Sequence, residues 1–124
     1  MKRRFQENNW RSNPTFKSLV KALCACTSEE QMANFLRDIG TLAELKAWSE
    51  RLDVAKRLSI GQSYREIAKE TGASTTTVSR VAWFIENGEK GYTSIVGPFQ
   101  PLTTTYGHHH TLHSAPRVRS KQRQ

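Results

Sequence analysis

The sequence predicts an all-α fold, and two observations lead to that prediction. Between residues 13 and 88 the apolar side chains recur at spacings of three and four, which is the period of an amphipathic helix, and a capping signal precedes each apolar run. The same stretch shows no sustained alternation of apolar and polar residues, so nothing in it favours a strand. We therefore expect a series of helices that fill one domain.

The first expected helix begins at Pro14. Asn13 is a favoured N-cap residue, and proline is favoured at the first helical position. Cys24 is expected in the core, and a helix that carries Cys24 and Cys26 holds them on different faces, which excludes a relaxed disulfide between them. The apolar stripe consists of Phe16, Leu19, Val20, Leu23 and Cys24.

Capping-box patterns introduce the next two expected helices. Thr27 with Glu30 opens the second helix, and Thr41 with Glu44 opens a third that closes near Gly61. The apolar stripes consist of Met32, Phe35, Leu36 and Ile39 in the second helix and of Leu42, Leu45, Trp48, Leu52, Ala55 and Leu58 in the third.

The segment from Tyr64 to about Ile85 predicts a helix-turn-helix. Gly72 lies where the first helix of the pair must end in a left-handed conformation, Ser74 can cap the second, and Ala68 is small where the two helices cross. The apolar wedge between the helices would consist of Ile67, Val78 and Val81.

The start of the second helix of this pair is rich in hydroxyls. Serine and threonine are poor helix formers, so their concentration here indicates a use besides helix formation. Short hydroxyls and an arginine suit base edges and phosphate oxygens in a major groove. The candidate DNA-contacting residues are Ser74, Thr75, Thr76, Ser79 and Arg80. An ordinary helical hairpin with a hydroxyl-rich start is the alternative.

The net charge of +8 belongs to the two ends of the chain. Residues 1–13 carry four Lys/Arg and one Glu, residues 97–124 carry four Lys/Arg and no acid, and residues 14–96 contribute only +1. We expect residues 1–13 and 97–124 to be disordered basic arms that either touch phosphate or simply aid solubility. The histidines of the second arm, His108 to His110 and His113, are not expected to hold a metal.

Several classes of function find no support in the sequence. No apolar run is long enough for a membrane span, and no apolar stretch follows the basic N-terminus as in a secretory signal, so we expect a cytoplasmic protein. No nucleophile elbow, phosphate loop or metal-ligand motif is present. We expect no catalytic residues, no metal and no enzyme activity.

The stretch from Thr27 to about Val96 resembles the Trp-repressor superfamily, and most closely its YerC/YecD-type branch. The motifs that carry the resemblance keep their order and spacing across three helices, and they are residues 35–39, 41–45, 51–55, 67–75 and 77–81. The resemblance implies an intertwined homodimer over residues 14–96 whose two reading heads face successive turns of DNA. It also implies that Arg65 contacts DNA beside the hydroxyl-rich helix start.

The resemblance further implies a dimer core and a ligand pocket. Trp48 and the apolar cluster Trp83, Phe84 and Ile85 are expected at the dimer interface. In the Trp repressor, two arginines and two threonines surround the corepressor, and the matching positions here are Thr41, Arg51, Thr77 and Arg80. L-tryptophan is nevertheless not expected as a cofactor, because Ser74 to Thr76 replace the repressor's small and apolar run and the preceding turn is one residue shorter.

Three functions remain open from the sequence. The first is a sequence-specific transcriptional regulator, as a repressor, that binds double-stranded DNA as a homodimer. The second is the DNA-targeting module of a recombinase or transposase, although the acids are scattered among Lys and Arg and 124 residues leave no room for a catalytic domain. The third is a protein-interaction module that keeps the fold without binding DNA.

Overall fold

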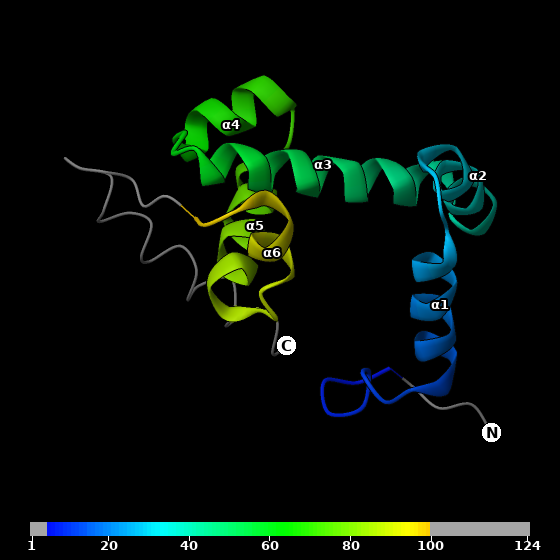
Figure 1. Cartoon of the computed structure of the whole chain (residues 1–124). Coiled ribbons are helices and arrows are strands. Elements are labelled where there is room, and N and C mark those ends of the chain that lie inside the picture. Colours follow the sequence, from blue (N-terminus) through cyan, green and yellow to red (C-terminus); the bar gives the residue numbers. More distant parts are fainter. Residues whose placement is uncertain (1–4, 100–124) are drawn as a thin grey trace. The chain divides into compact units, whose positions relative to one another are not determined.

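The computed structural model describes residues 5–99. Helices make up all the regular secondary structure in this part of the chain. This confirms the all-α prediction, and Figure 1 shows the order of the helices. They are α1 (Pro14–Ala25), α2 (Glu29–Ile39), α3 (Leu42–Ser59), α4 (Tyr64–Thr71), α5 (Thr75–Asn87) and α6 (Gly91–Val96). Among the described residues, no helix is both long and apolar enough to span a bilayer. The chain divides into two compact units, Met1–Leu45 and Lys46–Gln124.

In the N-terminal unit, α1 begins as its sequence predicts. The Asn13 side-chain oxygen accepts hydrogen bonds from the backbone N–H groups of Thr15 at 2.9 Å and Phe16 at 3.1 Å, and Pro14 occupies the first helical position. These bonds satisfy two of the N–H groups that a helix start leaves without partners. Asn13 itself is buried, with 8% of its surface exposed.

Residues 5–13 differ from the disordered arm that their composition predicted. The backbone N–H groups of Asn9 and Trp10 donate to the Gln6 carbonyl at 3.0 and 2.9 Å, so this segment forms hydrogen-bonded turns. The rings of Phe5 and Trp10 both pack edge-on against Phe16, with centroid separations of 5.8 and 5.5 Å. The aromatic contacts with α1 order a segment that charge alone would leave solvated. Residues 1–4 lie outside the described part.

The start of α2 lies one residue later than predicted. Ser28, not Thr27, is the N-cap, and its hydroxyl accepts from the N–H of Gln31 at 3.0 Å. The N–H of Thr27 instead donates to the Gln31 side chain at 2.6 Å. Serine caps a helix as well as threonine does, so the Ser28–Gln31 pair takes the place of the predicted Thr27–Glu30 pair.

Neither α1 nor α2 contains a buried residue. Their apolar stripes exist as predicted but are only partly covered within the chain, because most of their residues are half-buried and Val20 and Ile39 remain 40% and 52% exposed. For the same reason Cys24 is exposed, and the prediction that it lies in the core is wrong for a single chain.

Helix α3 starts with the predicted capping box. The Thr41 hydroxyl accepts from the Glu44 N–H at 3.0 Å, and the Glu44 carboxylate accepts from the Thr41 N–H at 2.8 Å. Only the C-terminal half of α3 contributes buried residues, while Leu42, Trp48 and Leu52 stay exposed.

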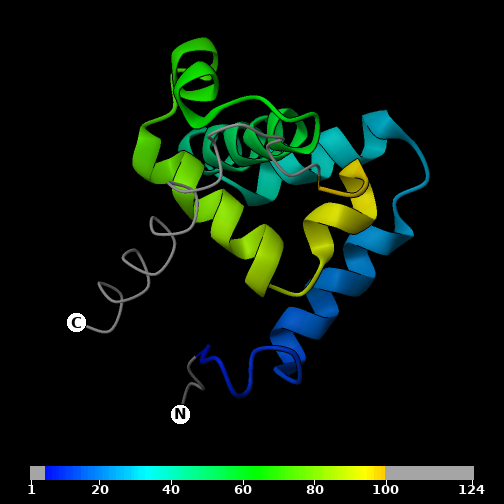
Figure 2. The same ribbon diagram turned by 90° about the vertical axis from the view of Figure 1, so that its left-hand side faces the viewer.

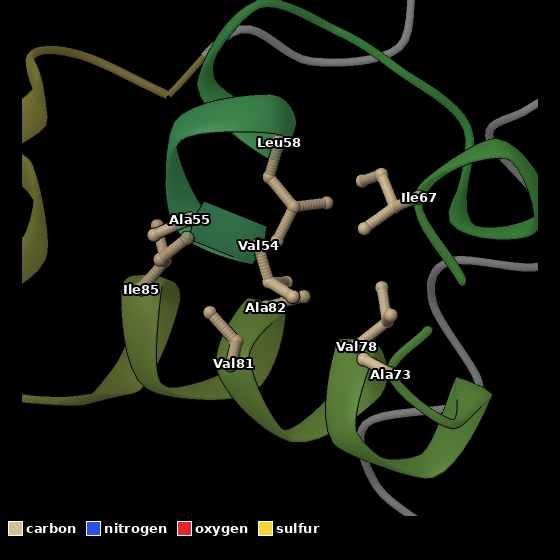
Figure 3. Packing of buried hydrophobic residues seen from close by; sticks show 9 residues of the cluster. All are labelled: Val54, Ala55, Leu58, Ile67, Ala73, Val78, Val81, Ala82 and Ile85. Carbon is tan, nitrogen blue, oxygen red and sulfur yellow. The ribbon is translucent and has the colours of Figure 1, made fainter. Parts of the chain in front are cut away.

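The hydrophobic core lies in the Lys46–Gln124 unit, where side chains from α3, α4, α5 and the turn between α4 and α5 meet (Figure 3). Its buried members are Val54, Ala55, Leu58, Ile67, Ala73, Val78, Val81, Ala82 and Ile85. Ile85 therefore belongs to the core of its own chain, not to a surface left for a partner, and that part of the dimer-interface prediction is wrong. Phe84, its neighbour, is 48% exposed.

Helix α6 has no counterpart in the sequence prediction. It follows a turn in which Lys90 has a left-handed conformation, with φ of 67°. The chain then turns back so that α6 packs against α5 (Figure 2). After α6, Phe99 packs against the core, so the expected disordered tail does not begin at residue 97. The histidine-rich segment lies outside the described residues.

Candidate nucleic-acid interface

Helix α4 is fixed at both ends by the residues that flank it. Ser63 and Glu66 form a reciprocal capping box, in which the Ser63 hydroxyl accepts from the Glu66 N–H and the Glu66 carboxylate accepts from the Ser63 N–H, each at 3.2 Å. Gly72 ends the helix in the predicted left-handed conformation, with φ of 83°. The capping box was not predicted, although the Ser-x-x-Glu pattern signals it in the sequence.

The turn between α4 and α5 is held by hydroxyl groups. Thr71 Oγ1 donates to the Ile67 carbonyl at 2.7 Å and accepts from the Ala73 N–H at 3.0 Å. Ser74 is the N-cap of α5, as predicted, and its Oγ accepts from the Thr77 N–H at 3.1 Å. These bonds, together with buried Ala73, set the angle at which α5 leaves the turn.

The predicted apolar wedge joins the two helices. Ile67 from α4 and Val78 from α5 are fully buried, and Val81 is 3% exposed. Figure 3 shows Ile67 pointing toward Leu58 and Val78, so that α3, α4 and α5 meet around one side chain. Ala68 packs against the same cluster. Residues 64–87 therefore form a helix-turn-helix whose two helices share a single core.

The candidate reading surface lies at the start of α5 and beside it on α4. Arg65, Thr75 and Thr76 are exposed, as is Arg80 one turn further along α5, whereas Ser79 is half-buried. The Ser74 hydroxyl is engaged in capping, where it lies 3.2 Å from Thr77 Oγ1. Thr75 and Thr76 are therefore the predicted hydroxyl residues that this surface presents most openly.

The first turns of α2, α3 and α4 each carry an acidic residue, whereas the first turn of α5, like those of α1 and α6, carries none. The N-terminus of a helix has a partial positive charge and presents backbone N–H groups, both of which favour a phosphate. Without a carboxylate beside it, the α5 N-terminus keeps that preference for an external anion.

Tyr64 connects the start of α4 with the end of α5. Burial raises the pKa of its phenol to about 12, and the carboxylate of Glu86 adds to the shift. Tyr64 packs against the hydrophobic core, and its neutral form is the one that the fold stabilises.

A second feature of this unit is a cavity of about 830 Å³ bounded by α3, α5, α6 and the α5–α6 turn. Three of the four predicted pocket residues, Arg51, Thr77 and Arg80, line it together with Thr76. The remaining lining residues are Leu52, Val81, Phe84, Gly88, Glu89, Gly91, Tyr92 and Ile95. Thr41, the fourth predicted pocket residue, belongs to the other unit, Met1–Leu45, where its hydroxyl caps α3.

The cavity wall from α6 was not expected, because α6 itself was not predicted. Burial raises the pKa of the Tyr92 phenol, and the nearby Arg51 guanidinium opposes that shift. The cavity therefore combines two arginines and the carboxylate of Glu89 with apolar walls and a neutral phenol. Among the described residues, no group of His, Cys, Asp and Glu side chains is arranged to hold a metal ion.

Comparison with known proteins agrees with this geometry. Residues 14–98 match the family model of the Trp repressor protein. The chain belongs to the Trp repressor family. YerC of Bacillus subtilis (strain 168), which is itself uncharacterized, is 35% identical over 74 residues, spanning 60% of this chain and 71% of YerC.

Two solved structures resemble the fold. The crystal structure of a candidate Trp repressor from Staphylococcus aureus has a TM-score of 0.68 and 32% identity over 73% of this chain and 91% of its own. A TrpR like protein from Eubacterium eligens ATCC 27750 has a TM-score of 0.67 and 31% identity over 75% of this chain and 99% of its own. The Trp repressor family is one of helix-turn-helix DNA-binding regulators, not of enzymes.

Proposed function

We propose that the protein is a sequence-specific transcriptional repressor that binds double-stranded DNA as a homodimer in the cytoplasm. The proposal rests on one observation. Helices α4 and α5 form a helix-turn-helix that exposes Arg65 on α4 and Thr75 and Thr76 at the start of α5, and the first turn of α5 carries no acid. A surface of this kind fits the major groove, with hydroxyls and arginine for base edges and helix N–H groups for phosphates. Ser74, Ser79 and Arg80 extend it.

The exposed apolar surface supports the homodimer. Helices α1 and α2 are amphipathic but bury none of their residues, and Trp48 and Phe84 are 45% and 48% exposed. Apolar faces on this scale mark protein interfaces rather than the surface of a stable monomer. A two-fold dimer places two reading heads on one face of the duplex, with half-sites about 34 Å apart.

The two competing functions lack such an observation. A recombinase or transposase module requires a catalytic domain elsewhere, and a protein-interaction module does not account for the acid-free, hydroxyl-rich start of α5. Both remain outcomes of the test below.

The cavity supports a subordinate proposal about regulation. A volume of about 830 Å³ lies within the range of small-molecule sites, and Arg51 with Arg80 would suit a carboxylate on a partly apolar body. Thr76 lines the cavity as well as belonging to the reading surface, so an occupant would touch both. L-tryptophan is one member of that class; we expect it not to be required, because Ser74 to Thr76 replace the repressor's small and apolar run and the turn before α4 is one residue shorter.

The proposed function is tested with Arg65→Ala and a matched variant, Lys69→Ala, which removes the same charge from the next turn of α4. If Arg65 reads a base, its loss relaxes preference at one base pair in each half-site by roughly 1–3 kcal/mol. Lys69→Ala should weaken binding to all sequences alike. Quantitative binding to a set of single-base variants of the selected duplex measures both. Failure of the unmodified protein to bind any duplex at low salt would favour the interaction module.

A further inference from the structure

Arg57, near the end of α3, is the centre of a side-chain cluster that the reading surface does not include. Its Nε donates to Asp53 Oδ1 at 3.2 Å, its Nη1 donates to Gln62 Oε1 at 3.4 Å, and Nη1 also donates to Glu70 Oε1. The partners come from α3 itself, from the α3–α4 connection and from the last turns of α4. The Arg57 side chain is 28% exposed, so it is partly shielded from water.

The backbone of Arg57 binds the same connection. Its carbonyl accepts from the N–H of Ile60 at 3.3 Å and from the N–H of Gln62 at 3.1 Å. Between these two residues Gly61 has a left-handed conformation with φ of 86°. A single residue thus fixes the path of the chain from α3 into α4 through its carbonyl and its guanidinium together.

This arrangement differs from an ordinary surface ion pair elsewhere on α3. Lys46 and Glu50 are four residues apart on one helix, 3.6 Å from each other, and the lysine side chain is 79% exposed. Such a pair links nothing beyond its own helix and contributes little. Arg57 and Glu70 instead join two helices across thirteen residues of sequence, and the planar guanidinium can hold several acceptors in fixed directions.

Glu70 lies near the C-terminal end of α4, so its contact with Arg57 attaches that end of the helix to α3. At the other end of α4 the Ser63 capping box holds the backbone, and in the middle Ile67 is locked in the core. The Arg57–Glu70 contact adds a third attachment beside the turn at Gly72. Three attachments fix the rotation of α4 about its own axis, and that rotation determines where the exposed Arg65 side chain lies.

We propose that Arg57 is a positioning residue for DNA recognition, which clamps α4 to α3 and thereby sets the place of Arg65 on the duplex. The inference rests on the proposed DNA-binding function. Arg57 touches no DNA in this account, so its removal should change sequence preference more than general affinity.

The test uses the full chain and three variants. Arg57→Gln breaks the clamp from one side and Glu70→Ala from the other, while Lys46→Gln removes a cation of α3 that lies outside the clamp. Amide hydrogen exchange without DNA reports the attachment of α4. The ratio of dissociation constants for random and selected duplexes reports sequence preference.

Both clamp variants should speed exchange in residues 67–72 and lower the preference ratio, each by roughly fivefold, the scale of a partly exposed ion pair. Lys46→Gln should leave exchange and ratio within twofold of the unmodified protein while weakening binding to both duplexes equally. Glu70→Ala is decisive for mechanism, because it makes α4 less acidic. A gain of affinity for both duplexes with an unchanged preference ratio in that variant would show that Glu70 acts by repelling phosphates and would overturn the positioning role.

The failure of the inference is distinguishable from that of the proposed function. If the unmodified protein binds DNA selectively and Arg57→Gln keeps both its exchange rates and its preference ratio, the inference is wrong and the proposed function stands. If the unmodified protein binds no duplex, both the proposed function and the recognition role of Arg57 are overturned, and the exchange rates report only whether the clamp holds α4.

Discussion

The turn at Gly72 offers a test in which conformation is separated from packing. Gly72 has φ of 83°, and a Cβ added there would meet no atom within 4 Å. Gly72→Ala therefore creates no clash, and its whole cost is that of placing a Cβ in the left-handed region. That cost is roughly 1–2 kcal/mol, offset in part by the smaller backbone freedom of alanine in the unfolded chain.

We expect a net loss of about 1 kcal/mol in the free energy of unfolding, or about fivefold in the folding equilibrium constant. Gly91→Ala is the matched control, because Gly91 also faces open space but does not have a positive φ, and it begins α6. There alanine should stabilise the protein by roughly 0.5–1 kcal/mol. The two substitutions add the same methyl group and should act with opposite sign.

Urea-induced unfolding followed by helical circular dichroism measures both variants. All samples need one protomer concentration, since the stability of a dimer depends on it. Equal stabilities for the two variants would contradict this expectation, because they would mean that the left-handed conformation of Gly72 does not limit which residues the turn accepts.

Two further predictions concern the core beneath the reading surface. Ile67→Ala empties the fully buried point where α3, α4 and α5 meet, so the free energy of unfolding should fall by roughly 2–5 kcal/mol in urea titrations, and a loss below that of Gly72→Ala would contradict this packing. The pKa of Tyr64 is raised to about 12 from 10.0, so the unfolded chain loses its phenol proton first and stability should decline as the pH rises from 10 toward 12. Tyr64→Phe should reduce that decline by about 1 kcal/mol after allowance for partial exposure, and an unchanged slope would show that folding does not raise the pKa of Tyr64.

The parts of the fold that local chemistry determines were predictable from the sequence. Gly72 and Ser74 define the turn between α4 and α5 because only a few residue types suit those backbone positions. The Asn13 cap and the Thr41–Glu44 box are equally local, and the structure contains both. Where two residues cap equally well, as at Thr27 and Ser28, the pattern located the helix start only to within one position.

The parts that depend on tertiary contacts were not predictable in this way. Helix α6 is short and rich in poor helix formers, and it is stable through packing against α5. The turns at residues 5–13 depend on aromatic contacts with Phe16. The Arg57–Glu70 contact joins positions that no helical period relates. An apolar stripe also does not show whether the same chain or a partner covers it. Cys24 was therefore predicted to lie in the core, although it is exposed in the single chain.

The residues of the candidate site also divide into those that the sequence predicted and those that depend on tertiary contacts. The resemblance to the Trp repressor predicted a pocket at Thr41, Arg51, Thr77 and Arg80. The structure places the last three around one cavity, whereas Thr41 belongs to the other unit. The walls that α6 provides, including Tyr92, were beyond reach of sequence reasoning because they require the return of the chain after Lys90.

Selection of bound sites from a pool of random duplexes, with the full chain and at low salt, tests whether the protein is a homodimeric, sequence-specific regulator. We expect enrichment of a two-fold symmetric sequence whose half-sites lie about 34 Å apart, in the absence of any added ligand. A parallel selection with L-tryptophan should enrich the same sequence. A bound pool that stays as diverse as the input, or that enriches only single unpaired half-sites, would contradict a homodimeric, sequence-specific regulator.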